Sequence, residues 1–220
     1  MSVGLNYSKG NTEQTQYNAN LSIRRSTSRT RFLSDYFGNI SESGGAKTVD
    51  NNRIQSQFDI FKTRKYYFRP IFGEYYSDPL KNISYKITAG CGMGYYFINN
   101  PKTEWEVGAG PGFQATKFES VESGQDDKET SPGFLGMTRY DTELTNDIDF
   151  VFKYTFQILN DVSGRYTHHT LTSFEIGLTD SIDFDITLMW DRVQKPKPDD
   201  TGNVPDKNDF NIIFGVGVEF

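Results

Sequence analysis

The sequence predicts an all-β protein, a closed antiparallel transmembrane β-barrel of about 12 strands in up-and-down order. Two observations support this prediction. Apolar residues occupy every second position through one strand-length segment after another, and short polar turns alternate with longer links between these segments. A barrel strand tilted by about 45° needs roughly 9–11 residues to cross a bilayer, which is the length of most of these segments.

The alternation is clearest toward the C-terminus. Over 148–158, isoleucine, phenylalanine and tyrosine occupy every second position, and the same period continues over 174–190 and 210–220. Such a period gives each strand one apolar and one mainly polar face. The chain ends on Phe220. A terminal aromatic after an alternating strand is similar to the sorting signal of outer-membrane barrels, so we expect the barrel assembly machinery to recognise Phe220.

The remaining strands follow when the same pattern is extended toward the N-terminus. The expected strands lie near 2–9, 15–25, 29–39, 52–61, 65–76, 82–97, 104–117, 134–144, 148–158, 168–178, 182–192 and 209–220. Lipid offers no hydrogen-bond partner to an open sheet edge, so the first and last strands are expected to pair.

The links between these strands alternate in length. Tight polar turns are expected at 25–28, 62–64, 99–102, 145–147 and 179–181, and longer links at 41–51, 119–133 and 193–208. Bacterial barrels place short turns in the periplasm and long loops outside, so both termini are expected in the periplasm. The links 10–13 and 77–81 are short exceptions on the outer side.

Length and charge limit the classes of protein that fit. The chain has 220 residues, a net charge of −6 and one cysteine, Cys91. The length fits a single domain over 1–220, the acidic balance disfavours nucleic-acid binding, and a lone cysteine forms no internal disulfide. No stretch approaches the roughly 20 apolar residues of a transmembrane helix. We expect no cofactor or metal, and we expect that the signal peptide of a Gram-negative outer-membrane protein has been removed.

If the apolar face contacts lipid, the opposite face lines the lumen, and it carries charges of both signs. The residues expected to line the lumen are Arg31, Arg53, Arg69, Lys86, Glu106, Arg139, Asp141, Asp149, Lys153, Glu175 and Asp185. A barrel of this size lies between side-chain-filled barrels of about 8 strands and open porins of about 16–18 strands. These charges therefore form either a structural salt-bridge network or the lining of a path for small solutes.

Two rows of glycines are predicted on the inner side of adjacent strands. They are Gly90, Gly92 and Gly94 in one strand and Gly108, Gly110 and Gly112 in the next. Because glycine has no side chain, these rows leave room for strong curvature or for bulky neighbours such as Tyr67 and Arg69.

Several short motifs, taken in order, resemble a known family. They are GNT at 10–12, QFD at 57–59, TRKYYF at 63–68, NISYK at 82–86, GCGMGYY at 90–96 and GAGPG at 108–112. Together they resemble the salt-induced outer-membrane family called domain-of-unknown-function 481, over nearly the whole chain. The resemblance implies an outer-membrane barrel, and it implies no substrate and no site residues.

Three functions stay open from the sequence: a narrow channel or small-solute transporter, a structural or interaction barrel, and a lipid-active enzyme. The last would use His168 or His169 with Ser163 or Ser173, but their spacing is generic, so we expect no catalytic activity. Outer-membrane lipid and lipopolysaccharide are the expected partners. A soluble lipocalin-like barrel would need the inverse orientation, with an apolar lumen and a polar exterior.

Overall fold

The computed structural model describes residues 2–8, 14–179 and 182–218, and within them the chain forms twelve strands and one short 3-10 helix. The elements are β1 (Ser2–Ser8), β2 (Gln14–Ser26), β3 (Thr30–Ser43), β4 (Ala46–Phe61), β5 (Tyr66–Asp78), η1 (Pro79–Lys81), β6 (Ile83–Asn99), β7 (Thr103–Phe118), β8 (Lys128–Thr145), β9 (Ile148–Ile158), β10 (Tyr166–Thr179), β11 (Ile182–Val193) and β12 (Asn208–Val218). Each strand pairs antiparallel with its neighbours in sequence, and β1 pairs with β12 to close the barrel. The predicted all-β fold, a closed antiparallel barrel in up-and-down order, is confirmed. In the described part of the chain, no helix is long and apolar enough to cross a membrane.

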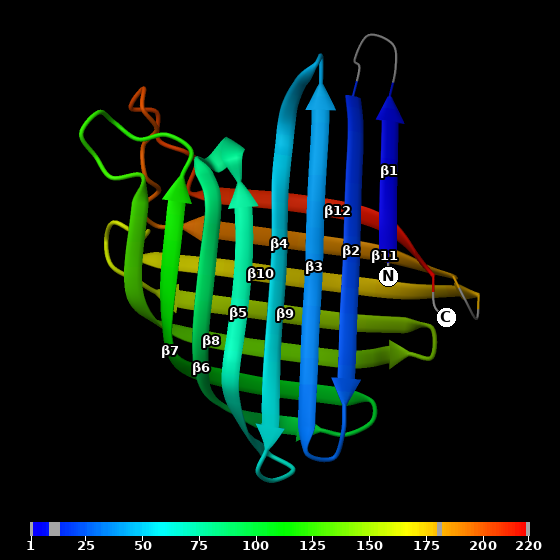
Figure 1. Ribbon diagram of the computed structural model, residues 1–220. Helices are drawn as coiled ribbons and strands as arrows, with labels where there is room; N and C mark the ends of the chain where they lie inside the picture. The colour runs from blue at the N-terminus through cyan, green and yellow to red at the C-terminus, as the bar shows by residue number, and fades with distance from the viewer. Residues whose placement is uncertain (1, 9–13, 180–181, 219–220) are drawn as a thin grey trace.

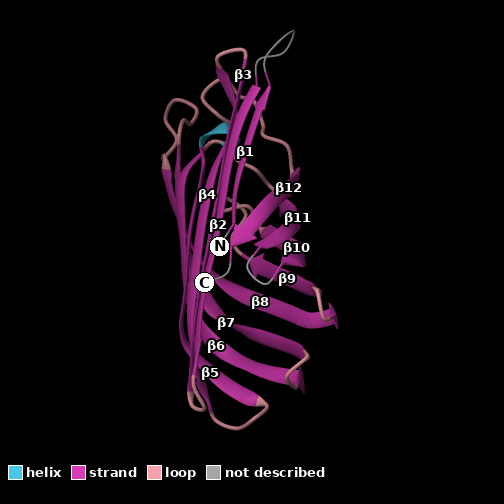
Figure 2. Cartoon of the chain, turned by 90° about the vertical axis from the view of Figure 1, so that its right-hand side faces the viewer, coloured by secondary structure: helices cyan, strands magenta, loops and turns pink. Residues whose placement is uncertain are grey.

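The barrel is flattened. Strands β1–β5 run across β8–β12, and β6 and β7 bend from one wall to the other (Figure 1). The side view shows the wall of β1–β5 as a nearly flat sheet that curves at one end into the wall of β8–β12 (Figure 2). Side chains from the two walls therefore meet across a narrow lumen.

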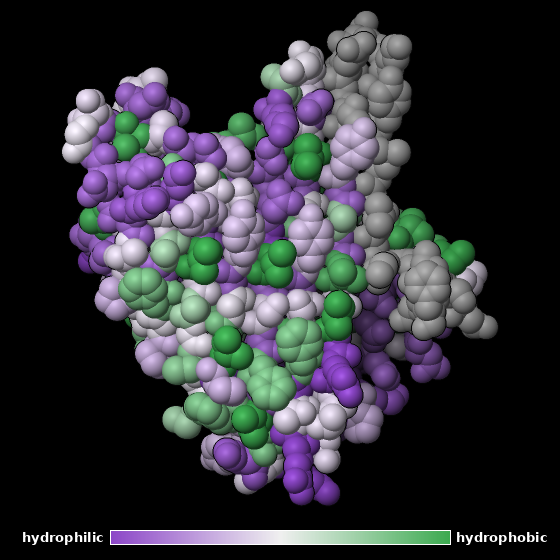
Figure 3. All heavy atoms as spheres, viewed as in Figure 1, coloured by the Kyte–Doolittle hydropathy of each residue, from purple (hydrophilic) through white to green (hydrophobic). Residues whose placement is uncertain are grey.

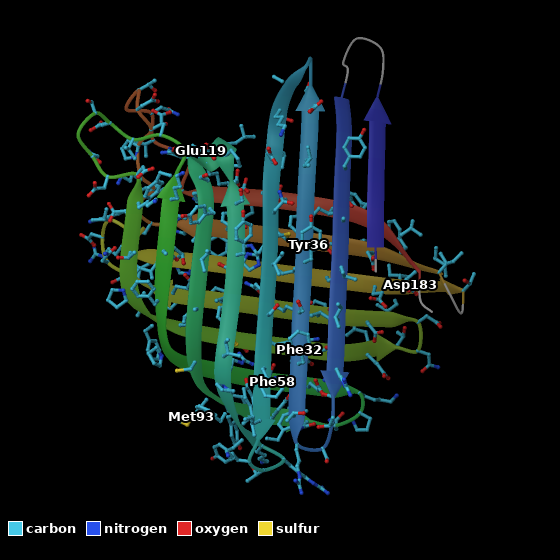
Figure 4. The ribbon with its side chains drawn as sticks, in the orientation of Figure 1. Phe32, Tyr36, Phe58, Met93, Glu119 and Asp183 are labelled. Carbon is cyan, nitrogen blue, oxygen red and sulfur yellow. The ribbon has the colours of Figure 1, made fainter. Side chains whose placement is uncertain are left out.

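The two ends of the barrel differ in their connections. Loops 119–127, 159–165 and 194–207 lie at one end, here called the long-loop end, and tight turns such as 27–29 and 62–65 lie at the other, the short-turn end. Figure 4 labels Glu119 at the long-loop end and Asp183 at the short-turn end. This alternation of lengths follows the sequence prediction. Phe220, which is expected to be recognised by the barrel assembly machinery, lies outside the described residues.

Two predicted loops are wrong in extent. The link expected over 41–51 is a tight hairpin, because β3 and β4 continue to a turn at Gly44 and Gly45. Both glycines adopt positive φ, 58° and 78°, as a two-residue hairpin turn requires. The loop expected over 119–133 ends earlier, because β8 already begins at Lys128.

The outer wall is apolar and the interior is polar. Met93 is 71% exposed and Phe214 is 60% exposed, whereas Asp59 is 0% exposed and lies inside the barrel. Apolar side chains gather across the middle and lower part of the front wall, between hydrophilic ends (Figure 3). This orientation is the inverse of a lipocalin-like barrel.

The facing glycine rows are confirmed in β6 and β7, where the sheet bends. The ring of Tyr67 fills the space where a side chain at Gly94 would lie, and its hydroxyl lies 3.1 Å from the Cβ position of Gly108. At Gly110, the Cβ position is occupied by the backbone carbonyl of Cys91. The glycines thus make room for Tyr67 at Gly94 and for Leu135 at Gly90 and Gly112, and they let two backbones approach closely.

We expect Gly110→Ala to destabilise the barrel by about 1–3 kcal/mol, because overpacking forces backbone to move. The added Cβ would clash with the Cys91 carbonyl oxygen and lie 2.5 Å from the Gly92 Cα, both in β6. Gly136→Ala in β8 is the matched control, since a Cβ there meets nothing within 4 Å. Urea unfolding in detergent micelles measures both variants, and equal stabilities would contradict the prediction.

Candidate functional site

The lumen near the short-turn end is filled by a buried charge cluster. Arg31, Asp59, Arg69 and Glu106, here called the inner cluster, project inward from β3, β4, β5 and β7 and are at most 4% exposed. Asp59 Oδ2 accepts hydrogen bonds from Arg31 Nε at 2.9 Å and Nη2 at 2.6 Å, and its Oδ1 accepts one from Arg69 Nε at 2.6 Å. Arg31 Nη2 also donates to Glu106 Oε2 at 2.7 Å. Two cations and two carboxylates balance, as buried charges require.

Aromatic rings enclose this cluster. The Arg31 guanidinium carbon lies 5.3 Å from the ring centre of Tyr67, 5.5 Å from that of Tyr96 and 5.9 Å from that of Phe61. Arg31 Nη1 also donates a hydrogen bond to the Tyr96 hydroxyl. Cation–π contacts of this kind strengthen when the cation is removed from water. The aromatic rings therefore help to fix Arg31 across the lumen.

A second cluster lies nearer the long-loop end. Arg53, Glu74, Lys86, His169 and Asp191, here called the loop-side cluster, come from β4, β5, β6, β10 and β11. Arg53 donates to Asp191 at 2.7 Å and to Glu74 at 3.4 Å, and the Lys86 ammonium lies 3.7 Å from Glu74. His169 Nδ1 lies 2.9 Å from Asp191 Oδ1. Both clusters thus mix charges of both signs inside the barrel.

Ion pairs between non-neighbouring strands cross the lumen. From the short-turn end to the long-loop end, the described residues form Arg24–Glu104 at 2.7 Å, Asp35–Lys153 at 2.7 Å, Arg53–Asp191 at 2.7 Å and Lys81–Asp209 at 2.5 Å. These cross-lumen pairs join β2 to β7, β3 to β9, β4 to β11 and η1 to β12. They tie the two walls together along the barrel.

Little free space is left between these pairs. One cavity of about 50 Å³ borders Asp35 and Lys153, and another of about 40 Å³ borders the loop-side cluster. Since about 10–15 Å³ of such volume holds one water molecule, each cavity has room for a few waters. Phe37 from β3 packs with Met189 and Ile213 from the opposite wall. The lumen is therefore narrow and largely filled.

The residues predicted to line the lumen divide into five that belong to the two clusters and six that do not. Arg31, Arg53, Arg69, Lys86 and Glu106 are buried in the two clusters. The remaining six lie on the same inward face but outside both clusters.

Of those six, Arg139, Asp141 and Lys153 are half-buried, and Arg139 donates to Asp141 at 2.7 Å. The other three, Asp149, Glu175 and Asp185, stand opposite one another in register in β9, β10 and β11 near the short-turn end.

The sequence prediction missed Glu74 and Tyr76 because β5 contains a bulge. Arg69 and Phe72 both face inward although three positions separate them, and the register with β6 shifts between these residues. A strict period of two places Glu74 on the face opposite Arg69. Pro70 is the signal that the sequence offers, because proline inside a strand is typical of bulges.

In the described part of the chain, neither His168 nor His169 is hydrogen-bonded to Ser163 or Ser173. His168 Nδ1 lies 2.8 Å from the Tyr154 hydroxyl, and His169 bonds Asp191, while Ser173 Oγ lies 3.3 Å from Thr187 Oγ1. Within residues 2–8, 14–179 and 182–218, no group of three or more His, Cys, Asp or Glu side chains is placed to hold a metal ion.

Comparison with known proteins identifies relatives of this architecture. A family model described as "Protein of unknown function, DUF481" matches residues 1–220, which confirms the resemblance noted in the sequence. Curated proteins gave no sequence match.

Among solved structures, the chain is similar to one described as "NanC porin structure in rhombohedral crystal form", with 9% identity, a TM-score of 0.53, and coverage of 100% of this chain and 99% of that chain. A bacterial polysaccharide outer membrane secretin aligns with 8% identity, a TM-score of 0.39, and coverage of 93% and 79%. The outer membrane channel DcaP of Acinetobacter baumannii aligns with 9% identity, a TM-score of 0.40, and coverage of 97% and 65%. The likeness to the porin concerns the barrel fold.

Proposed function

Because the chain belongs to the DUF481 family of proteins of unknown function and folds as a porin-like barrel, we propose that it is an integral protein of the Gram-negative outer membrane. We propose further that its lumen is a narrow, charge-lined passage for small ions and polar solutes. The short turns would lie in the periplasm and the long loops outside. Outer-membrane lipid and lipopolysaccharide would surround the apolar band.

The observation that carries this proposal is the polar lumen, which solvent enters from both ends. The side chains of Arg24 and Glu104 are 36% and 26% exposed at one end, and those of Lys81 and Asp209 are 23% and 33% exposed at the other. Between them, Arg53 is only 6% exposed. Solvent-exposed ion pairs typically contribute about 0–1 kcal/mol, so the exposed Arg24–Glu104 pair can part readily. The buried clusters then form the constriction.

Conductance in planar bilayers tests the passage. We expect a small conductance for the unaltered protein and a severalfold larger one for the double variant Arg53→Ser/Asp191→Ser, because it removes a cross-lumen pair at the constriction. Replacing both partners together avoids leaving either one as an uncompensated buried charge. The matched control is Lys47→Ser/Asp50→Ser, which removes an ion pair of 2.7 Å beside the β3–β4 hairpin turn. The control should conduct like the unaltered protein.

A structural barrel without transport is the second candidate. It is favoured by the packing of Phe37 on Met189 and Ile213, and by cavities of only about 50 and 40 Å³ in the lumen. Absence of conductance in the unaltered protein and in both double variants would support this candidate and contradict the passage.

A further inference from the structure

A basin opens at the short-turn end of the lumen. It has a volume of about 590 Å³ and lies between the β2–β3 turn, the β4–β5 turn and the adjoining ends of β6 and β7. Its charged lining residues are Arg24, Arg29, Lys62, Arg64 and Glu104. Ligand sites for small molecules commonly measure about 300–1,000 Å³, so the basin is large enough for a small solute.

The basin carries an excess of positive charge. Glu104 accepts two hydrogen bonds from Arg24 Nη2, at 3.0 and 2.7 Å, so this carboxylate is already paired. Arg29, Lys62 and Arg64 are exposed and form no ion pair with any described residue. Three cations therefore face the basin, and no carboxylate of the described residues pairs with them.

The turns that present these cations are fixed by local hydrogen bonds. Thr27 Oγ1 accepts a hydrogen bond from the backbone N–H of Arg29 at 3.2 Å. Thr63 Oγ1 accepts one from the backbone N–H of Lys65 at 3.1 Å. The Asn99 side-chain amide donates to the Arg64 carbonyl at 3.0 Å, which ties the β4–β5 turn to the end of β6. Ordered turns fix the backbone that carries the cations before a ligand arrives, which reduces the entropy lost on binding.

The basin leads directly to the inner cluster. Phe61 and Tyr96 line it, and behind these rings lies the Arg31 guanidinium. A solute leaving the basin toward the long-loop end would meet the inner cluster next, so the basin is the mouth of the lumen.

We propose that this basin binds small soluble anions that carry two or more carboxylate or phosphate groups. The planar guanidinium group of arginine forms bidentate hydrogen bonds with carboxylate and phosphate. Several unpaired cations favour a ligand that carries several negative groups. The basin would then concentrate such anions at the periplasmic mouth of the passage. This inference rests on the proposed function for its side of the membrane and names the solute class that enters there.

Isothermal titration calorimetry of the full chain in detergent micelles tests the site, with citrate as the probe. We expect binding that weakens as ionic strength rises, because exposed charges are screened by salt. Arg29→Gln/Arg64→Gln should bind citrate about tenfold more weakly, since each lost arginine removes charge-assisted hydrogen bonds. The matched control is Lys117→Gln/Lys128→Gln, which removes the same charge from two lysines that stand opposite each other in β7 and β8 at the long-loop end. The control should bind citrate with the affinity of the unaltered protein. Heat-dependent mobility on gels checks that every variant is folded.

Either of two results would overturn the inference: no citrate binding by the unaltered protein, or equal weakening in both double variants. Calorimetry in micelles requires no conduction, so the inference and the proposed function can fail separately. Citrate binding without conductance would contradict the passage alone. Conductance without citrate binding would contradict the basin alone.

Discussion

Replacing Asp59 with asparagine is expected to destabilise the barrel by about 3–5 kcal/mol, the usual effect of removing one partner from a buried charge network. The Asp59 side chain is 0% exposed and accepts hydrogen bonds from both Arg31 and Arg69. Asparagine keeps the size of the side chain but removes its charge. Two buried guanidinium groups would then share Glu106 as the remaining carboxylate of the inner cluster.

Urea unfolding followed by tryptophan fluorescence measures this loss, with Trp105 and Trp190 as reporters. Asp50→Asn is the matched control, because Asp50 pairs with Lys47, whose side chain is 52% exposed. We expect the control to change stability far less, since water replaces the partner of an exposed pair. Equal effects of the two substitutions would show that the inner cluster adds no more stability than an exposed pair.

With the proposed membrane location, Ile186→Arg should cost about 2–4 kcal/mol in lipid, the penalty for a cation on a lipid-facing wall near the bilayer centre. Ile186 faces outward because the next residue, Thr187, is buried inside at 6% exposure. Its neighbours in register are Phe174 in β10 and Phe214 in β12, so an arginine there would interrupt an apolar band that spans three strands.

Unfolding from liposomes and from detergent micelles measures the cost of this substitution. The matched control is Leu178→Arg, because Leu178 is 61% exposed and lies near the short-turn end of β10, where the edge of the proposed membrane span would lie. There the cost should fall to about 0–1 kcal/mol. If Ile186→Arg were equally harmless in liposomes, the outer wall would be a surface in contact with water, and the proposed membrane location would be wrong.

The sequence by itself determined the strands and the orientation of most side chains. Side chains of a β-strand alternate between its two faces, so a period of two in hydropathy fixes which face is apolar without any knowledge of partners. For this reason the twelve strands, the outward direction of Phe214 and the inward direction of Arg31, Arg69 and Glu106 were all predicted. The glycine rows were predicted in the same way, because their positions also follow the alternation.

The tertiary structure decided which charges meet. The bulge after Arg69 moves Glu74 to the inner face. The register of β5 with both β4 and β6 shifts there, so a strict period of two fails beyond Pro70. One partner of Arg53 is Asp191, 138 positions later in the chain. In strands without a bulge, the hydropathy pattern fixes the face of each side chain. Only the closure and flattening of the barrel set which residues of opposite walls stand at the same height. Most of the lumen charges could therefore be predicted, while Glu74, the cross-lumen pairs and the basic basin required the folded barrel.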